Sequence, residues 1–177
     1  MAGRNLLCDN RIRIVNATSF MKSCEPVNVL NDDDSKLWMS EPGLPQAIVL
    51  DLGSLTKIKG LQYTGFGFRC AKSYASNPSK IAVNTSADGV KFSSWAILTK
   101  IDQRTGTQKF SLAPRSADKC KYIEVVVLAT FGANRTYIGQ IFLEGLEQPP
   151  NTYSTLPGTV RTSYRTQGAF ETADTAG

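Results

Sequence analysis

The sequence predicts an all-β protein, an antiparallel β-sandwich or barrel, and three observations support this prediction. Short apolar segments alternate with polar residues at the period of two that is typical of half-buried strands. Clusters of glycine, proline, asparagine, aspartate and serine separate these segments and are typical of turns. No segment shows a helical period longer than two turns, so helices are not expected to build the core.

The predicted strands follow one another along the chain. In QAIVLDLG, Ile48 and Leu50 share one face, and Asp51 is expected to face solvent. KIAVNTSADG ends in Asp88-Gly89, a strong signal for the turn of a hairpin. Further strands are predicted in KFSSWAIL, QKFSLAP, KYIEVVVLATFG and TYIGQIFLEG, and a short helical segment is predicted in EPVNVL. The segment KYIEVVVLATFG is apolar on both faces for part of its length, which is typical of a central strand.

Composition and charge restrict the classes of function. The chain has 177 residues, of which 41% are hydrophobic, so a packed core is expected. The net charge is +5, and residues 147–177 contribute −1 (two Arg against two Glu and one Asp), so the first 146 residues carry +6. This excess favours an anionic partner. No cluster of Lys and Arg resembles a nucleic-acid-binding module, so no nucleic-acid partner is expected.

Membrane insertion and secretion are not expected. No apolar run reaches the roughly 18 residues that a membrane helix needs, and the N-terminus shows no secretion signal. We therefore expect a cytoplasmic location. Cys8, Cys24, Cys70 and Cys120 are scattered along the chain, and we expect them to be reduced and buried rather than joined in two disulfides.

The composition divides the chain into two parts. Residues 1–146 carry the strand pattern and are predicted to form one globular domain. Residues 147–177 are rich in Thr, Ser, Gly and Pro and show neither the helical nor the strand period of apolar residues. They are therefore predicted to form an extended, non-globular tail. We expect a partner to hold this tail through three spaced aromatic residues, Tyr153, Tyr164 and Phe170.

The order of several motifs resembles that of a known family. CEPVNVLNDDDSKLWMS is followed by PQAIVLDLG, KIKGLQY, PSKIAVNTSADGVKFSSW and the closing RTYIGQIFLEG. Over residues 8–145 this arrangement resembles the discoidin, or coagulation factor 5/8 type C, domain, and its character is closer to the intracellular, non-secreted members. The resemblance implies an antiparallel jelly-roll sandwich of the galactose-binding-like type. We expect Trp38 and Trp95, the largest apolar side chains, to lie in its core.

Many members of that family bind a structural calcium ion at the turn before the tryptophan. In this chain the corresponding ligands are Asp33, Asp34 and Ser35, and Gln140 stands where the closing strand would offer a carboxylate. Because that charge is missing, we expect no bound calcium, and no other cofactor is expected. We expect instead an acidic turn, capped by the hydrogen bonds of its own side chains, that holds Trp38.

Catalysis is not expected. The chain has no histidine, so neither a Ser-His-Asp triad nor a Cys-His pair can form. The four cysteines lack the spacing of a zinc site. The predicted protein is therefore a binding protein.

Two binding functions remain. The main prediction is a non-catalytic protein-interaction subunit of a cytoplasmic assembly, with the tail as an additional contact, because intracellular members of the family are assembly subunits. One form of this prediction is a ciliary or axonemal protein that binds microtubules, with tubulin as its partner. The alternative is a carbohydrate- or lipid-binding module with a structural calcium ion and a glycan as its ligand. Contacts with the ligand or partner are predicted in two loops at the end of the sandwich, GFGFRCAKSY and FGANRTY, through Phe66, Phe68, Arg69, Tyr74 and Arg135.

Overall fold

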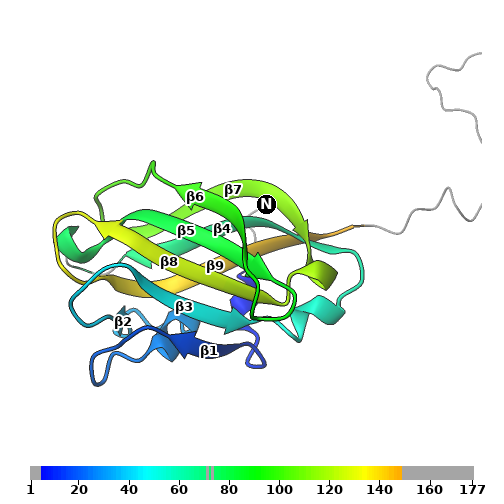
Figure 1. Ribbon diagram of the computed structural model, residues 1–177, viewed down its shortest axis with the longest axis horizontal. Coiled ribbons are helices and arrows are strands. Elements are labelled where there is room, and N and C mark those ends of the chain that lie inside the picture. Colours follow the sequence, from blue (N-terminus) through cyan, green and yellow to red (C-terminus); the bar gives the residue numbers. More distant parts are fainter. Residues whose placement is uncertain (1–4, 71, 73, 149–177) are drawn as a thin grey trace, which may run out of the picture.

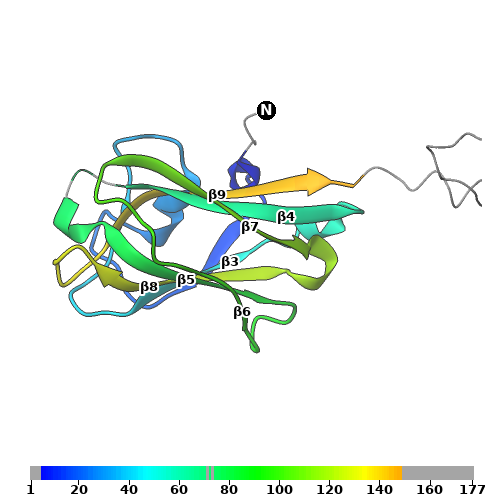
Figure 2. The same cartoon turned by 90° about the horizontal axis from the view of Figure 1, so that it is seen from above.

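The computed structural model describes residues 5–70, 72 and 74–148 of the chain, and these form two antiparallel sheets packed face to face (Figure 1, Figure 2). One sheet has five strands in the order β1-β3-β8-β5-β6, and the other has four in the order β2-β9-β4-β7. The strands are β1 Arg13–Ala17, β2 Trp38–Met39, β3 Gln46–Asp51, β4 Leu61–Cys70, β5 Pro78–Ser86, β6 Ser93–Leu98, β7 Gly106–Ser116, β8 Tyr122–Thr130 and β9 Tyr137–Glu147. The predicted all-β sandwich is confirmed.

Helical structure within the described residues is limited to short 3₁₀ turns. They are η1 Leu6–Cys8, η2 Pro26–Leu30, η3 Leu55–Lys57, η4 Tyr74–Ser76 and η5 Ala117–Lys119. The element η2 confirms the short helical segment predicted in EPVNVL. In the described part of the chain, no helix is long and apolar enough to cross a membrane.

Strand β8 lies at the centre of the five-stranded sheet, between β3 and β5. Its residues Ile123 and Val125 pair with Leu50 and Ile48 of β3, and all four side chains are buried in the core. Because β8 has a strand on each side and the second sheet against one face, the sequence needs β-branched residues at most of its positions. This placement confirms the prediction of a central strand.

Strand β4 lies between β7 and β9 in the four-stranded sheet, and it contains the segment GFGFRC. Phe66 and Phe68 point into the core, with 1% and 0% of their surface exposed. Gly67 lies on the other face, where a Cβ atom would come within 2.6 Å of the carbonyl oxygen of Gln108 on β7. The prediction that these phenylalanines contact a ligand is wrong, because the segment is a central strand rather than a loop.

The two tryptophans lie in the core, as predicted. Trp38 is fully buried, and its indole N–H donates to the carbonyl of Ser19 at 3.0 Å. Trp95 is 9% exposed and donates to the carbonyl of Ala113 at 2.6 Å. Both buried N–H groups therefore have a partner, which removes the cost of burying them.

The predicted hairpin turn joins β5 to β6. Gly89 adopts a φ of +79°, a conformation that favours glycine. The carboxylate of Asp88 accepts hydrogen bonds from the amides of Val90 and Lys91, at 2.8 and 2.9 Å. These bonds within the turn stabilise it, and they lower the pKa of Asp88.

Strand β9 ends one residue beyond the predicted domain boundary at residue 146. Most of the predicted tail, residues 149–177, lies outside the described residues. The predicted contact residues Tyr153, Tyr164 and Phe170 lie there as well.

Candidate functional site

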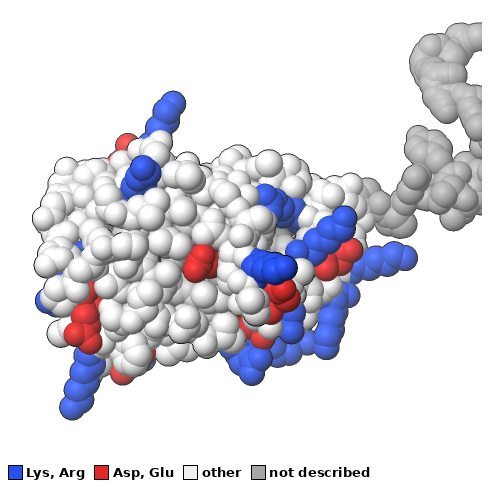
Figure 3. Space-filling model, in the orientation of Figure 1, with Lys and Arg blue, Asp and Glu red and all other residues white. Residues whose placement is uncertain are grey.

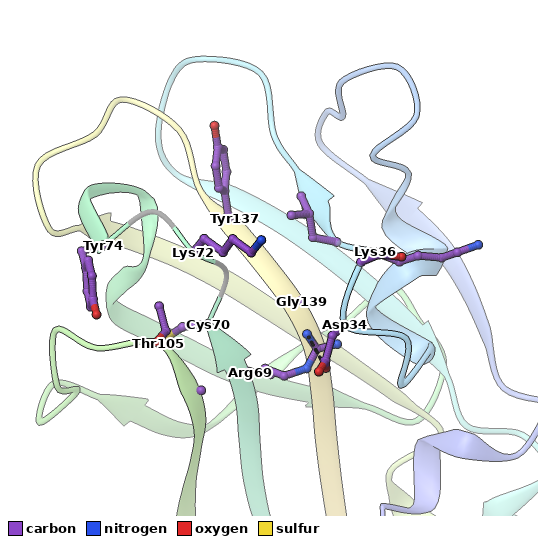
Figure 4. A pocket seen from close by; sticks show the side chains of 12 residues that line it. Asp34, Lys36, Arg69, Cys70, Lys72, Tyr74, Thr105, Tyr137 and Gly139 are labelled. Carbon is purple, nitrogen blue, oxygen red and sulfur yellow. Dashed lines mark ion pairs between the residues drawn. The ribbon is translucent and has the colours of Figure 1, made fainter.

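A cavity of about 770 Å³ lies at the end of the sandwich where β4 ends and β9 begins (Figure 4). We call it the end cavity. Four parts of the chain that are distant in sequence build it: the turn before β2, the end of β4 with the following loop, the start of β7 and the start of β9. Its lining residues are Asp34, Ser35, Lys36, Leu37, Arg69, Cys70, Lys72, Tyr74, Thr105, Gly106, Tyr137 and Gly139.

Arg69 is the most constrained charged side chain of the end cavity. Only 14% of its side chain is exposed, and its Nη1 lies 3.3 Å from Oδ1 of Asp34. Its Nη2 is buried and has no hydrogen-bond partner within the described residues. A buried donor without a partner costs free energy. A ligand that offered an acceptor oxygen to Nη2 would recover that free energy.

Gly139 of β9 makes room for this guanidinium. A Cβ atom at position 139 would lie 2.7 Å from Nη1 of Arg69 and 3.1 Å from its Cζ. Arg69 faces Gln140 in the β4–β9 register, so its side chain crosses the backbone of the neighbouring strand. Because glycine has no side chain, the guanidinium can lie against the backbone of β9 at this position.

Aromatic and cationic groups complete the lining. Tyr74 of η4 is half exposed, and Tyr137 is partly buried at the start of β9. Lys36, Arg69 and Lys72 bring three positive charges to the lining, against the one carboxylate of Asp34. Figure 4 shows that Lys36 points away from the other labelled side chains. The cavity thus has two phenols for polar and stacking contacts, and a positive charge excess.

The acidic turn before β2 is closed by its own side chains. Asn31 accepts a hydrogen bond from the amide of Asp33 at 2.8 Å. The carboxylate of Asp33 in turn accepts from the hydroxyl and the amide of Ser35, at 2.7 and 2.9 Å. These bonds lower the pKa of Asp33. The predicted self-capped turn in front of Trp38 is confirmed.

The predicted calcium ligands do not fit a calcium site. One oxygen of Asp33 is engaged by Ser35, and Asp34 pairs with Arg69. Gln140 is a neutral amide, 4% exposed, on β9. The described residues contain no group of three or more His, Cys, Asp or Glu side chains that could hold a metal ion. A guanidinium beside the turn also repels a divalent cation.

The other predicted contact residues divide into two groups. Arg69 and Tyr74 both line the end cavity, so the structure brings them together. Arg135 does not line it: its guanidinium donates to the sulfur of Met39 at 3.6 Å and packs beside β2. Lys72 and Tyr137 lie within the two predicted contact segments but were not among the predicted residues. Gly139 was missed because it lies in a strand that was treated only as framework.

Comparisons with known proteins agree with this fold. Solved structures with the same architecture include carbohydrate-binding modules. One from Clostridium perfringens, solved in complex with GalNAc-β-1,3-galactose, has a TM-score of 0.65 at 17% identity and covers 78% of this chain and 98% of its own. A chitosan-binding module from Paenibacillus sp. IK-5 has a TM-score of 0.62 at 18% identity, with 80% and 99% covered. The module of NanJ from C. perfringens, solved with galactose, has a TM-score of 0.59 at 13% identity, with 76% and 93% covered.

These structures define the class of the fold, a galactose-binding-like sandwich. The family model of the F5/8 type C domain matches residues 15–141, and the chain belongs to this family. No curated protein sequence matches the chain.

The comparisons correct the main functional prediction. The three solved structures described above were determined with sugars or are named for binding them, and they give no support to a protein partner such as tubulin. The expectation of a protein-interaction subunit in a ciliary or axonemal assembly is therefore wrong.

Proposed function

We propose that this chain is a non-catalytic carbohydrate-binding domain that holds a saccharide in the end cavity. The observation that carries the proposal is the buried Nη2 of Arg69, which has no partner among the described residues in a cavity that Tyr74 and Tyr137 also line. Binding sites for small ligands combine a concave surface with a few convergent polar groups. Hydroxyl groups of a sugar provide acceptors for Arg69, and its C–H faces provide partners for the tyrosine rings.

The geometry favours a saccharide that carries a carboxylate. Asp34 already places a carboxylate oxygen 3.3 Å from Nη1 of Arg69, which shows that this position accepts one. The side chain of Asp34 is 88% exposed, so its pairing is weak and a ligand can replace it. The positive excess of the lining attracts an acidic sugar over a neutral one. A uronic acid is therefore the expected ligand class.

Calorimetric titration with three oligosaccharides of matched length tests the proposal: an oligogalacturonate, a neutral galactose-containing oligosaccharide and a chitosan oligosaccharide. We expect the uronate to bind most tightly. Arg69→Gln should weaken its binding about tenfold or more, because charge-assisted hydrogen bonds are lost. Arg135→Gln is the matched control, since Arg135 does not line the end cavity.

The outcomes separate the two parts of the proposal. If the neutral oligosaccharide binds as tightly as the uronate and both depend on Arg69, the carbohydrate function stands and the acidic preference is wrong. If none of the three binds, or if Arg69→Gln and Arg135→Gln behave alike, the end cavity is not a saccharide site.

A further inference from the structure

A second cavity, of about 560 Å³, lies where β3 ends and η3 begins. This second cavity lies at the end of the sandwich opposite the end cavity. Strand β4 connects the two ends, because it begins shortly after η3, runs the length of the sandwich and ends at Cys70 in the end cavity. The second cavity is lined by Arg11, Arg13, Asp51, Gly53, Ser54, Thr56, Lys57 and Lys121. We call Arg11, Arg13, Lys57 and Lys121 the basic cluster. Figure 3 shows Lys and Arg side chains gathered toward this end of the molecule.

The lining contains no apolar or aromatic side chain. Such a surface offers no ring on which a sugar or a base could stack. It offers charges, hydroxyls and backbone groups. The ligand that fits it is therefore a small charged group.

The sign of the charge is positive. Four cations and one carboxylate line the cavity, and the excess is still two charges if Asp9, the ion-pair partner of Arg11, is counted as well. Lys57 and Lys121 have no carboxylate partner within 4.0 Å among the described residues. The ammonium group of Lys121 lies 5.1 Å from the centre of the Tyr122 ring, and its charge also lowers the pKa of Asp51. Two ammonium groups thus remain available to an anion.

The buried carboxylate of Asp51 fixes the position of Arg13 in the basic cluster. Asp51 was expected to face solvent, but its side chain is only 9% exposed. Its Oδ2 accepts from Nη2 of Arg13 at 2.9 Å, and its Oδ1 accepts from the amide of Gly53 at 2.8 Å. Both oxygens are therefore engaged inside the protein, and Asp51 fixes the fork of Arg13 instead of opposing a ligand.

Gly53 and Ser54 form the wall beside this pair. A Cβ atom at Gly53 would lie 3.4 Å from Cε of Lys121, so the lysine stem lies directly over the glycine. The hydroxyl of Ser54 has no hydrogen-bond partner in the described part of the chain. Rotation of this hydroxyl toward the cavity would give a bound anion a neutral donor beside the two ammonium groups.

We propose that the second cavity binds a tetrahedral oxyanion, a sulfate or phosphate group, with Lys57, Lys121 and Arg13 as its charged partners and Ser54 as a donor. Several converging donors suit a tetrahedral group with several terminal oxygens better than they suit a planar carboxylate, which has fewer acceptor oxygens. The group is either a free ion or part of an ester. The same chemistry occurs in a sulfated saccharide and in a phosphate ester.

Nuclear magnetic resonance of the ¹⁵N-labelled full chain tests the proposal. Sodium sulfate and sodium phosphate are titrated separately, with sodium chloride at equal ionic strength as the reference. We expect saturable shifts at the amides of Gly53, Ser54, Lys57 and Lys121 that chloride does not reproduce. Lys57→Gln with Lys121→Gln should weaken binding about tenfold or more. Lys80→Gln with Lys100→Gln is the matched control, because both lysines are exposed and neither lines the cavity.

Three results would overturn the proposal: shifts of equal size with chloride, equal affinity in the two double variants, or loss of the shifts in Arg69→Gln, which would place the anion in the end cavity. A sulfated oligosaccharide and glycerol 3-phosphate serve as further probes at the same residues. Tighter binding of either than of its inorganic ion supports the site and identifies the source of the group. This test does not depend on the saccharide function of the end cavity.

Discussion

The guanidinium of Arg69 lies against the backbone of Gly139, at the place where any other residue would put its Cβ atom 2.7 Å from Nη1. Gly139 is not required for its own conformation, since its φ lies outside the left-handed region that favours glycine. It is required by its neighbour. The pair therefore links a glycine in a framework strand to the chemistry of the end cavity.

Gly139→Ala should displace Arg69 and leave the fold intact. The added methyl group meets the far end of a flexible side chain, which can move at small cost. We expect uronate binding to fall about tenfold and the free energy of unfolding to change by less than about 1 kcal/mol. Calorimetric titration and urea denaturation measure the two effects. The double variant with Arg69→Gln should bind no worse than Arg69→Gln alone, and a further additive loss would show that the effect does not pass through Arg69.

Asp34→Asn should increase the affinity for acidic sugars. Asp34 competes with the ligand for Arg69, and the competition ends when its charge is removed. Because the Asp34 side chain is largely exposed, removing its charge should raise the affinity only about two- to fivefold and leave the free energy of unfolding unchanged. Titration of the oligogalacturonate into both forms measures this. Asp32→Asn removes the same charge from the same turn without touching Arg69, and an equal gain in that variant would mean that only net charge matters.

Much of the fold could be predicted because local patterns determine it. The alternation around Ile48 and Leu50 and the turn at Asp88-Gly89 depend on neighbouring residues only, and the structure confirms both. The strand β4 was missed because glycines face outward where polar residues are typical, while Phe66 and Phe68 face the core. Outward glycines are read as turn signals, although here the neighbouring strand β7 leaves no space for side chains.

The sites were harder to predict because they depend on register between distant segments. Arg69 could be proposed from its place near a loop, but its contact with Gly139 depends on the β4–β9 register. Asp51 was assigned to solvent because it alternates with Leu50 and Leu52, yet it is covered by Arg13, 38 residues away. Alternation indicates which face a side chain takes, and it does not indicate what covers that face.

Asp51 should make stability depend on pH. Burial raises the pKa of Asp51, but the hydrogen bonds from Arg13 and Gly53 and the charges of Lys121 and Arg13 outweigh it and hold the pKa below its usual value. The unfolded chain therefore binds this proton more tightly. The stabilisation is complete above the ordinary aspartate pKa of about 3.9 and is lost as pH falls through the lower pKa of the folded state.

Asp51→Asn tests this dependence. We expect it to lower the free energy of unfolding by about 1–2 kcal/mol at pH 7, since the exposure of Arg13 reduces the strength of the pair. The difference from the parent chain should shrink as pH falls below about 4. Urea denaturation at several pH values measures it. A difference for Asp51→Asn that stayed constant at low pH would contradict the assignment.

The cysteines should react unequally. All four are free thiols, which agrees with the expected reduced state, but Cys8 is exposed while Cys70 and Cys120 are buried. Burial raises the pKa of both buried thiols to about 11. Because the thiolate is the nucleophile, both should resist iodoacetamide at pH 8, while Cys8 should react. Mass spectrometry of the alkylated peptides measures this, and prior unfolding in urea should expose all sites. Modification of Cys120 in the folded chain at the rate of Cys8 would show that the core between η5 and β8 opens more readily than its packing indicates.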